Sequence, residues 1–208
     1  MEAETILTFC TAAFFLALAP GPDNLFVLSQ SALFGIRAGL WVTLGLCSGL
    51  IFHTLAVVLG VAAILKASPA AMSILKLFGA LYLLHLARLS FRSNQAGQGS
   101  EASQQLSIGQ LYLRGLVMNV TNPKVTMFFL AFLPQFVRDT ASLSISAQLC
   151  FLGFLFQLVT FLVFGSVSFF SGRIGKVLRE STQLQNRLNQ LAGLVFLVLA
   201  ALILKEFL

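Results

Sequence analysis

Apolar residues fill long stretches of this chain, and polar residues gather in the short gaps between them. Stretches of 18 or more apolar residues are typical of helices that cross a lipid bilayer. We interpret the recurring stretches as six membrane segments, at about 5–34, 39–65, 72–91, 111–137, 145–170 and 191–204. The pattern therefore predicts an all-α integral membrane protein with six transmembrane helices.

The first and fourth of these segments are interrupted by proline. Pro20-Gly21-Pro22 interrupts the first and Asn122-Pro123 the fourth. Proline lacks an N–H, and its ring clashes with the carbonyl four residues earlier, so a regular helix cannot continue through it. In hydrocarbon the freed carbonyls need partners inside the protein. Broken helices at membrane depth commonly line the binding site of a transporter, and we predict that these two breaks form one.

The paired breaks also indicate an internal duplication. Pro22 and Pro123 occupy the same place in their apolar runs, and each is followed by a charged residue, Asp23 or Lys124. Three segments per half would insert the halves in opposite senses, which makes a 3+3 inverted repeat. We expect one transporter domain over residues 1–208, with repeat 1 at about 1–91, a polar loop at about 92–110 and repeat 2 at about 111–208.

Composition excludes an ordinary soluble protein. The chain is 58% apolar and 10% charged, whereas a soluble domain is about 45–50% apolar and about 25% charged. The net charge of +6 does not indicate nucleic-acid binding, because the basic residues are scattered near segment ends and form no basic face. By the positive-inside rule, their positions predict that both termini lie outside and that the loop at about 92–110 is cytoplasmic.

The cysteines offer no redox or metal chemistry. Cys10, Cys47 and Cys150 all lie inside apolar segments, with no CxxC pair and no Cys/His cluster at metal-ligand spacing. We interpret them as buried apolar side chains, and we predict no metal site and no cofactor. The same absence argues against a membrane-embedded redox enzyme.

Each break has the sequence features of a helix that begins inside the membrane. Asn122 can cap a helix that begins at Pro123, and Gly21-Pro22-Asp23 reads the same way, with a carboxylate in the first turn. Two helix starts brought together would make an anion pocket, to which Lys124 adds positive charge and Asp23 negative charge. This arrangement suits a zwitterion. The alternative is that Asp23 and Lys124 simply pair with each other to stabilise the break.

Other polar residues lie deep in the apolar segments. Gly45, Gly49 and His53 are spaced by four and share one helix face, which is either a GxxxG packing surface or a wall of the site. His53 carries an imidazole, which titrates near physiological pH, so it makes either a structural hydrogen bond or a proton-coupling contact. Gln157 is a candidate for the same cavity, and Asn119 lies one turn before Pro123.

At these motifs the chain resembles the LysE/RhtB family of bacterial amino-acid exporters. The matching stretches are Ala19-Pro20-Gly21-Pro22-Asp23-Asn24, Gly79-Ala80-Leu81-Tyr82-Leu83 and Thr121-Asn122-Pro123-Lys124. The resemblance covers essentially the whole chain. It implies export of amino acids or close derivatives across the cytoplasmic membrane, driven by the proton gradient.

We therefore predict a secondary active exporter of amino acids in the bacterial inner membrane, working by proton antiport and alternating access. The alternatives are a passive channel and an exporter of another small solute or cation. The expected partners are the amino acid, protons and the lipid bilayer, with homo-oligomerisation left open. The predicted proton-coupling residues are Asp23 and His53. The predicted substrate-binding residues are Pro20, Gly21, Pro22, Asp23, Asn24, Gly45, Gly49, Asn119, Asn122, Pro123, Lys124 and Gln157.

Overall fold

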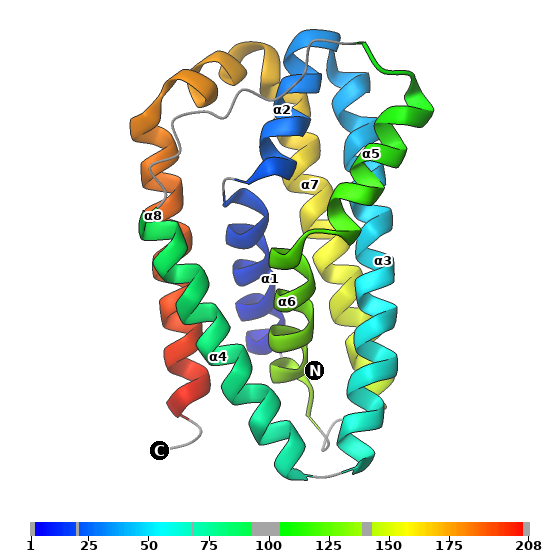
Figure 1. The fold of residues 1–208 in the computed structure, drawn as a ribbon, viewed down its shortest axis with the longest axis vertical. Coiled ribbons are helices and arrows are strands. Elements are labelled where there is room, and N and C mark those ends of the chain that lie inside the picture. Colours follow the sequence, from blue (N-terminus) through cyan, green and yellow to red (C-terminus); the bar gives the residue numbers. More distant parts are fainter. Residues whose placement is uncertain (1–2, 20, 68, 93–104, 139–142, 206–208) are drawn as a thin grey trace.

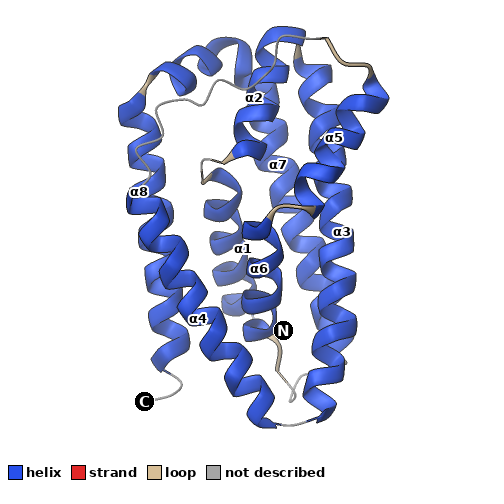
Figure 2. Cartoon of the chain, viewed as in Figure 1, coloured by secondary structure: helices blue, strands red, loops and turns tan. Residues whose placement is uncertain are grey.

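The computed structural model describes residues 3–19, 21–67, 69–92, 105–138 and 143–205, and every regular element among them is a helix (Figure 2). The prediction of an all-α protein is confirmed. In chain order the helices are α1 (Ala3–Leu18), α2 (Pro22–Phe34), α3 (Ile36–Ala67), α4 (Pro69–Arg92), α5 (Ile108–Val120), α6 (Pro123–Phe132), the short 3₁₀ helix η1 (Leu133–Phe136), α7 (Ile145–Glu180) and α8 (Thr182–Lys205).

The two predicted breaks are present. Among the described residues, four helices (α3, α4, α7 and α8) are long and apolar enough to cross a membrane. The pair α1 and α2 is bent by 64°, and α5 is bent by 52° against α6 and η1. The count is therefore four spans, or up to six if each bent pair crosses once. The 3+3 inverted repeat stays a prediction, and Pro20 lies outside the described residues.

The helices pack as an elongated bundle with the two breaks near its middle (Figure 1). On one side α3 packs along α5 and α7, and on the other α4 packs along α8. The bent pairs fill the space between, with α1 against α7 and α8, and α6 against α3 and α4. This arrangement brings together two breaks that lie about a hundred residues apart in the sequence.

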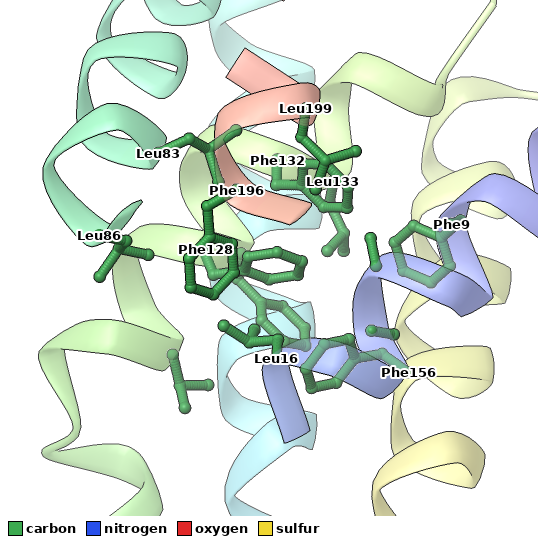
Figure 3. Close-up of a cluster of buried hydrophobic side chains, with 14 of the residues drawn as sticks. Phe9, Leu16, Leu83, Leu86, Phe128, Phe132, Leu133, Phe156, Phe196 and Leu199 are labelled. Atoms are coloured by element: carbon green, nitrogen blue, oxygen red, sulfur yellow. The ribbon is translucent and has the colours of Figure 1, made fainter. Parts of the chain in front are cut away.

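Two buried apolar clusters hold the bundle together. The aromatic cluster joins α1, α4, α6, α7 and α8 (Figure 3) and includes Phe9, Phe128, Phe132 and Phe156. Its rings are in direct contact, with 4.4 Å between the centroids of Phe128 and Phe132 and 5.4 Å between those of Phe128 and Phe156. The second cluster joins α2, α3, α5 and α7 and includes Phe164. The two clusters lie on opposite sides of the breaks along α7, because Phe156 precedes Phe164 by two turns.

The fifth predicted segment, at about 145–170, agrees with the apolar span Ile145–Ser171, whereas the sixth, predicted at about 191–204, begins earlier, at Gln183. The helices themselves extend beyond the predicted segments, because α7 runs on to Glu180 and α8 begins at Thr182. Helix propensity explains the difference, because Lys, Leu, Arg and Glu are good helix formers wherever the apolar run ends. The polar loop predicted at about 92–110 lies mostly outside the described residues. Its last part starts α5, which Ser107 and Gln110 cap reciprocally.

Close backbone packing between α3 and α5 depends on Gly45. A Cβ atom at Gly45 would lie 2.1 Å from the carbonyl oxygen of Tyr112, so a side chain there forces the two helices apart. We expect Gly45→Ala to destabilise the protein by about 1–3 kcal/mol, the usual cost of overpacking. Thermal unfolding in detergent measures this. Gly60→Ala in the same helix is the control, because nothing lies within 4 Å of its added Cβ. Equal midpoints for the two variants would contradict the assignment.

Candidate functional site

The end of α1 is closed by side chains from beyond both breaks. A helix leaves its last four carbonyls without intrahelical partners. Asn24 donates its side-chain amide to the carbonyls of Ala17 at 2.9 Å, Leu18 at 3.1 Å and Ala19 at 3.3 Å. Lys124 donates its ammonium to the carbonyls of Leu16 and Ala19, both at 3.3 Å. All four carbonyls are therefore satisfied inside the protein, which a helix end at membrane depth requires.

The start of α6 is capped by Asn122. Its side-chain oxygen accepts from the backbone N–H of Lys124 at 3.0 Å, and Pro123 occupies the first helical position, where its missing N–H costs nothing. The amide nitrogen of Asn122 donates to Oδ2 of Asp23 at 2.8 Å. One side chain thus fixes the α6 start and holds a carboxylate 99 residues away in sequence.

Asp23 is the buried acid at the centre of this arrangement. It lies in the first turn of α2, where the helix dipole favours negative charge, and is 7% exposed. Its Oδ2 is held by Asn122, but its Oδ1 has no hydrogen-bond partner among the described residues. No side chain caps α2, because Gly21 occupies the N-cap. The start of α2 is therefore open to a ligand in a way that the start of α6 is not.

Asp23 and Lys124, whose pairing the sequence left open, interact electrostatically but make no direct contact. In the part of the chain that the structure describes, no hydrogen bond or ion pair joins the two side chains. Asn122 contacts both residues and links them indirectly, while the Lys124 ammonium is directed to the end of α1. The carbonyls freed by the first break accept hydrogen bonds from Asn24 and Lys124.

A cavity of about 40 Å³ lies where the breaks meet. A water molecule needs about 10–15 Å³ of accessible space, so this cavity holds a few waters and is too small for an amino acid. Two more buried oxygens on its lining residues, Asn119 Oδ1 and Thr160 Oγ1, have no partner among the described residues. With Asp23 Oδ1 they make three unpaired buried oxygens on residues that line one small cavity. In this conformation the cavity cannot hold an amino acid.

The structure brings together most of the predicted site residues. Those that line the cavity are Gly21, Pro22, Asp23, Asn24, Asn119, Asn122 and Lys124. Pro123 lies between two of them, and Tyr82 of α4 donates its hydroxyl to the Pro123 carbonyl at 3.4 Å. Pro20 lies outside the described residues.

Four predicted residues lie beside the cavity lining rather than in it. Gly45 packs against the Tyr112 backbone, and Gly49 lets Asn119 approach so closely that an added Cβ would lie 2.6 Å from Asn119 Oδ1. His53 is buried, with its Nε2 at 3.1 Å from the Asn119 carbonyl oxygen. Gln157 is half-buried, and its carbonyl accepts from Cys47 Sγ at 3.8 Å. His53 and Gly49 therefore position Asn119, which itself lines the cavity.

Sequence reasoning missed several lining residues. Thr160 lies one turn beyond Gln157 on the polar face of α7, and that spacing was its only local signal. Phe156, Phe164 and Leu50 look like any other apolar membrane residue in the sequence. Among the described residues, no group of His, Cys, Asp or Glu side chains could hold a metal ion.

Comparison with known proteins finds a family model and several similar proteins that match this chain. A family model described as LysE type translocator matches residues 14–206. A leucine efflux protein of Enterobacter sp. (strain 638) is 31% identical over 203 residues, which covers 93% of this chain and 92% of the relative. The leucine efflux protein of Salmonella typhimurium (strain LT2) is 32% identical over 135 residues, 64% of each chain. An uncharacterized membrane protein of Vibrio cholerae is 28% identical over 197 residues, 95% of each chain. No solved structure matches.

Proposed function

The chain belongs to the LysE type translocator family, and we propose that it exports a neutral amino acid across the bacterial inner membrane through the cavity where its two helix breaks meet. The proposal that the solute is an amino acid draws on the relatives that are named leucine efflux proteins. The apolar helices place the chain in a membrane as a multi-pass protein. We retain the predicted orientation, with both termini outside.

The observation that carries the proposal is the set of three unpaired buried oxygens on residues that line the cavity. A primary ammonium group has three N–H donors, and Asp23 Oδ1, Asn119 Oδ1 and Thr160 Oγ1 each have acceptor capacity left. Burying an unpaired polar atom is costly, so an arrangement of three favours a ligand that pairs with them. We assign the ammonium of the amino acid to this position.

The carboxylate of the amino acid would face the open start of α2. The first-turn amides there have no side-chain cap, and a helix N-terminus attracts anions. Lys124 adds positive charge on the same cavity wall. The zwitterion is thereby oriented by both of its charged groups, with its side chain against Phe156, Phe164 and Leu50.

We propose that transport proceeds by alternating access, with the closed cavity as an intermediate between two open states. Asp23 is the proposed proton carrier, because it is the buried carboxylate that faces the solute. His53, which contacts the main chain of Asn119, is the second candidate. A proton that enters as an amino acid leaves supplies about 1.4 kcal/mol per pH unit, a tenfold gradient of the solute.

Transport by the purified protein tests the proposal. In proteoliposomes loaded with labelled leucine and other neutral amino acids, we expect efflux above that of protein-free vesicles. Acidifying the external buffer by one pH unit should raise the outward accumulation ratio by up to about tenfold if one proton is exchanged per solute. A protonophore should remove this effect. Efflux that ignores the pH gradient would reject proton antiport, and no efflux of any amino acid would reject the exporter.

A further inference from the structure

A second buried polar cluster lies between α2, α3 and α7, away from the cavity. We call it the Gln30–Ser168 cluster. It comprises buried residues of three helices that pack against one another, and the contact that joins all three is made by Ser31, Gly39 and Ser168. The others are Gln30 on α2, Thr43 on α3 and Ser171 on α7. Gln30 is 1% exposed and Ser168 is 0% exposed, so both are as deeply buried as the apolar core.

Two atoms of this cluster are left unpaired. Gln30 Oε1 and Ser168 Oγ have no hydrogen-bond partner among the described residues. The hydroxyls of Ser31, Thr43 and Ser171 instead bond to carbonyls of their own helices. The cluster therefore has acceptor capacity to offer, and buried oxygens of this kind are normally satisfied by water or a ligand.

Helices α2, α3 and α7 approach one another closely at Gly39. A Cβ atom at Gly39 would lie 1.7 Å from Ser31 Oγ and 2.5 Å from Ser168 Oγ, so all three helices approach one another here. This approach is lined by serine hydroxyls, and the second apolar cluster fills a neighbouring part of the same helix contacts. Glycine and serine also let membrane helices pack closely, so it is the two unpaired atoms, and not the small residues, that point to water or a ligand.

The cluster lies further along α2 and α7 from two of the residues that line the cavity. Gln30 lies seven residues after Asp23 on the same face of α2, about 10 Å along the axis. Ser168 lies eight residues after Thr160 on α7, about 12 Å along the axis. Both helices run side by side from the breaks towards the end of the bundle that carries the turn at Gly35 (Figure 1). The two unpaired atoms are thus displaced from the cavity in one direction and by a similar distance.

The two ends of the cavity are closed differently. Towards the start of α1 and the end of α6, several interlocked rings of the aromatic cluster fill the space. Towards the Gly35 end, Phe164 stands between Thr160 and Ser168 on α7 and lines the cavity itself. On this side Phe164 is the α7 side chain that lies between the cavity lining and the buried polar side chains of the cluster.

We propose that the Gln30–Ser168 cluster is the part of the solute path between the central cavity and the Gly35 end of the bundle, closed in this conformation by Phe164. It would hold water in the resting protein and pass the zwitterion when Phe164 moves. The identity of the solute rests on the proposed function, but the existence of a water-filled path does not.

Thiol labelling tests the path. In a background with Cys10, Cys47 and Cys150 replaced by alanine, Ser168→Cys should react with a charged, membrane-impermeant methanethiosulfonate. It should react from the same side as Gly109→Cys, which lies in the exposed first turn of α5 at the Gly35 end. The matched controls are Ser166→Cys, on an apolar groove of α7, and Ala13→Cys, within the aromatic cluster, and neither should react. Ser168→Cys that is as unreactive as Ala13→Cys would overturn the proposal.

A variant of Gln30 distinguishes a role in the solute path from a role in helix packing. Gln30→Leu keeps the volume but removes the unpaired oxygen, and we expect transport to fall at least tenfold with unchanged yield of folded protein. Gln30→Asn should retain part of the activity. Wild-type transport by Gln30→Leu would also overturn the proposal. Because labelling needs no transported solute, a reactive Ser168→Cys in a protein that exports no amino acid would reject the proposed function and leave the path intact.

Discussion

An Asp23→Asn variant is expected to lose about 10- to 100-fold in transport rate while inserting and folding as the wild type does. The amide keeps the size of the carboxylate and can still accept from Asn122, so the link between the two breaks is preserved. What is lost is the negative charge at the atom that faces the cavity. A hydrogen bond to a charged group is worth about 1.5–3 kcal/mol, and each 1.4 kcal/mol is tenfold in rate or affinity.

Exchange experiments divide the two roles that we assign to Asp23. If Asp23 binds the ammonium, Asp23→Asn loses both net efflux and the exchange of labelled for unlabelled solute at equal pH. If Asp23 only carries the proton, exchange survives and the response to a pH gradient disappears. Glu4→Gln is the control, because Glu4 is an exposed acid on α1 and far from the break in sequence. Transport by Asp23→Asn within twofold of the wild type would contradict both roles.

The breaks could be predicted from the sequence because their chemistry is local. Asn122 and Pro123 are typical of the N-cap and the first position of a helix, and Gly21 and Pro22 form a similar start. Each helix start can therefore be recognised without knowing any tertiary contact. The same reasoning predicted that the freed carbonyls would need partners inside the protein. It could not say which residues would supply them, because Lys124 reaches Leu16 across more than a hundred residues.

The rest of the cavity depends on packing. Thr160 and Phe164 face it because α7 crosses α1 and α2 at a particular angle, and sequence periodicity does not encode that angle. The extension of α7 and α8 beyond the predicted membrane segments, into residues 172–191, has a different cause. Hydropathy reports where lipid ends, whereas helix propensity decides where a helix ends, and in α7 the two do not coincide.

A Lys124→Met variant is expected to lose stability as well as transport, which distinguishes it from Asp23→Asn. Lys124 donates to the carbonyls of Leu16 and Ala19 at the end of α1, and a cation there also complements the helix dipole. Asn24 still reaches Ala19 in the variant, but no described side chain replaces the contact to Leu16. Leaving one buried carbonyl unpaired costs about 1–3 kcal/mol.

Thermal unfolding in detergent, measured beside transport, tests this assignment. Lys205→Met is the control, because Lys205 lies exposed at the end of α8. We expect a lower midpoint and little transport for Lys124→Met, and partial recovery of both for Lys124→Arg, which restores the charge and the donors. A wild-type midpoint with no transport would instead assign Lys124 to the solute carboxylate alone. The two breaks would then be held together by the bond from Asn122 to Asp23, and the ammonium of Lys124 would be free to follow the solute as the cavity opens.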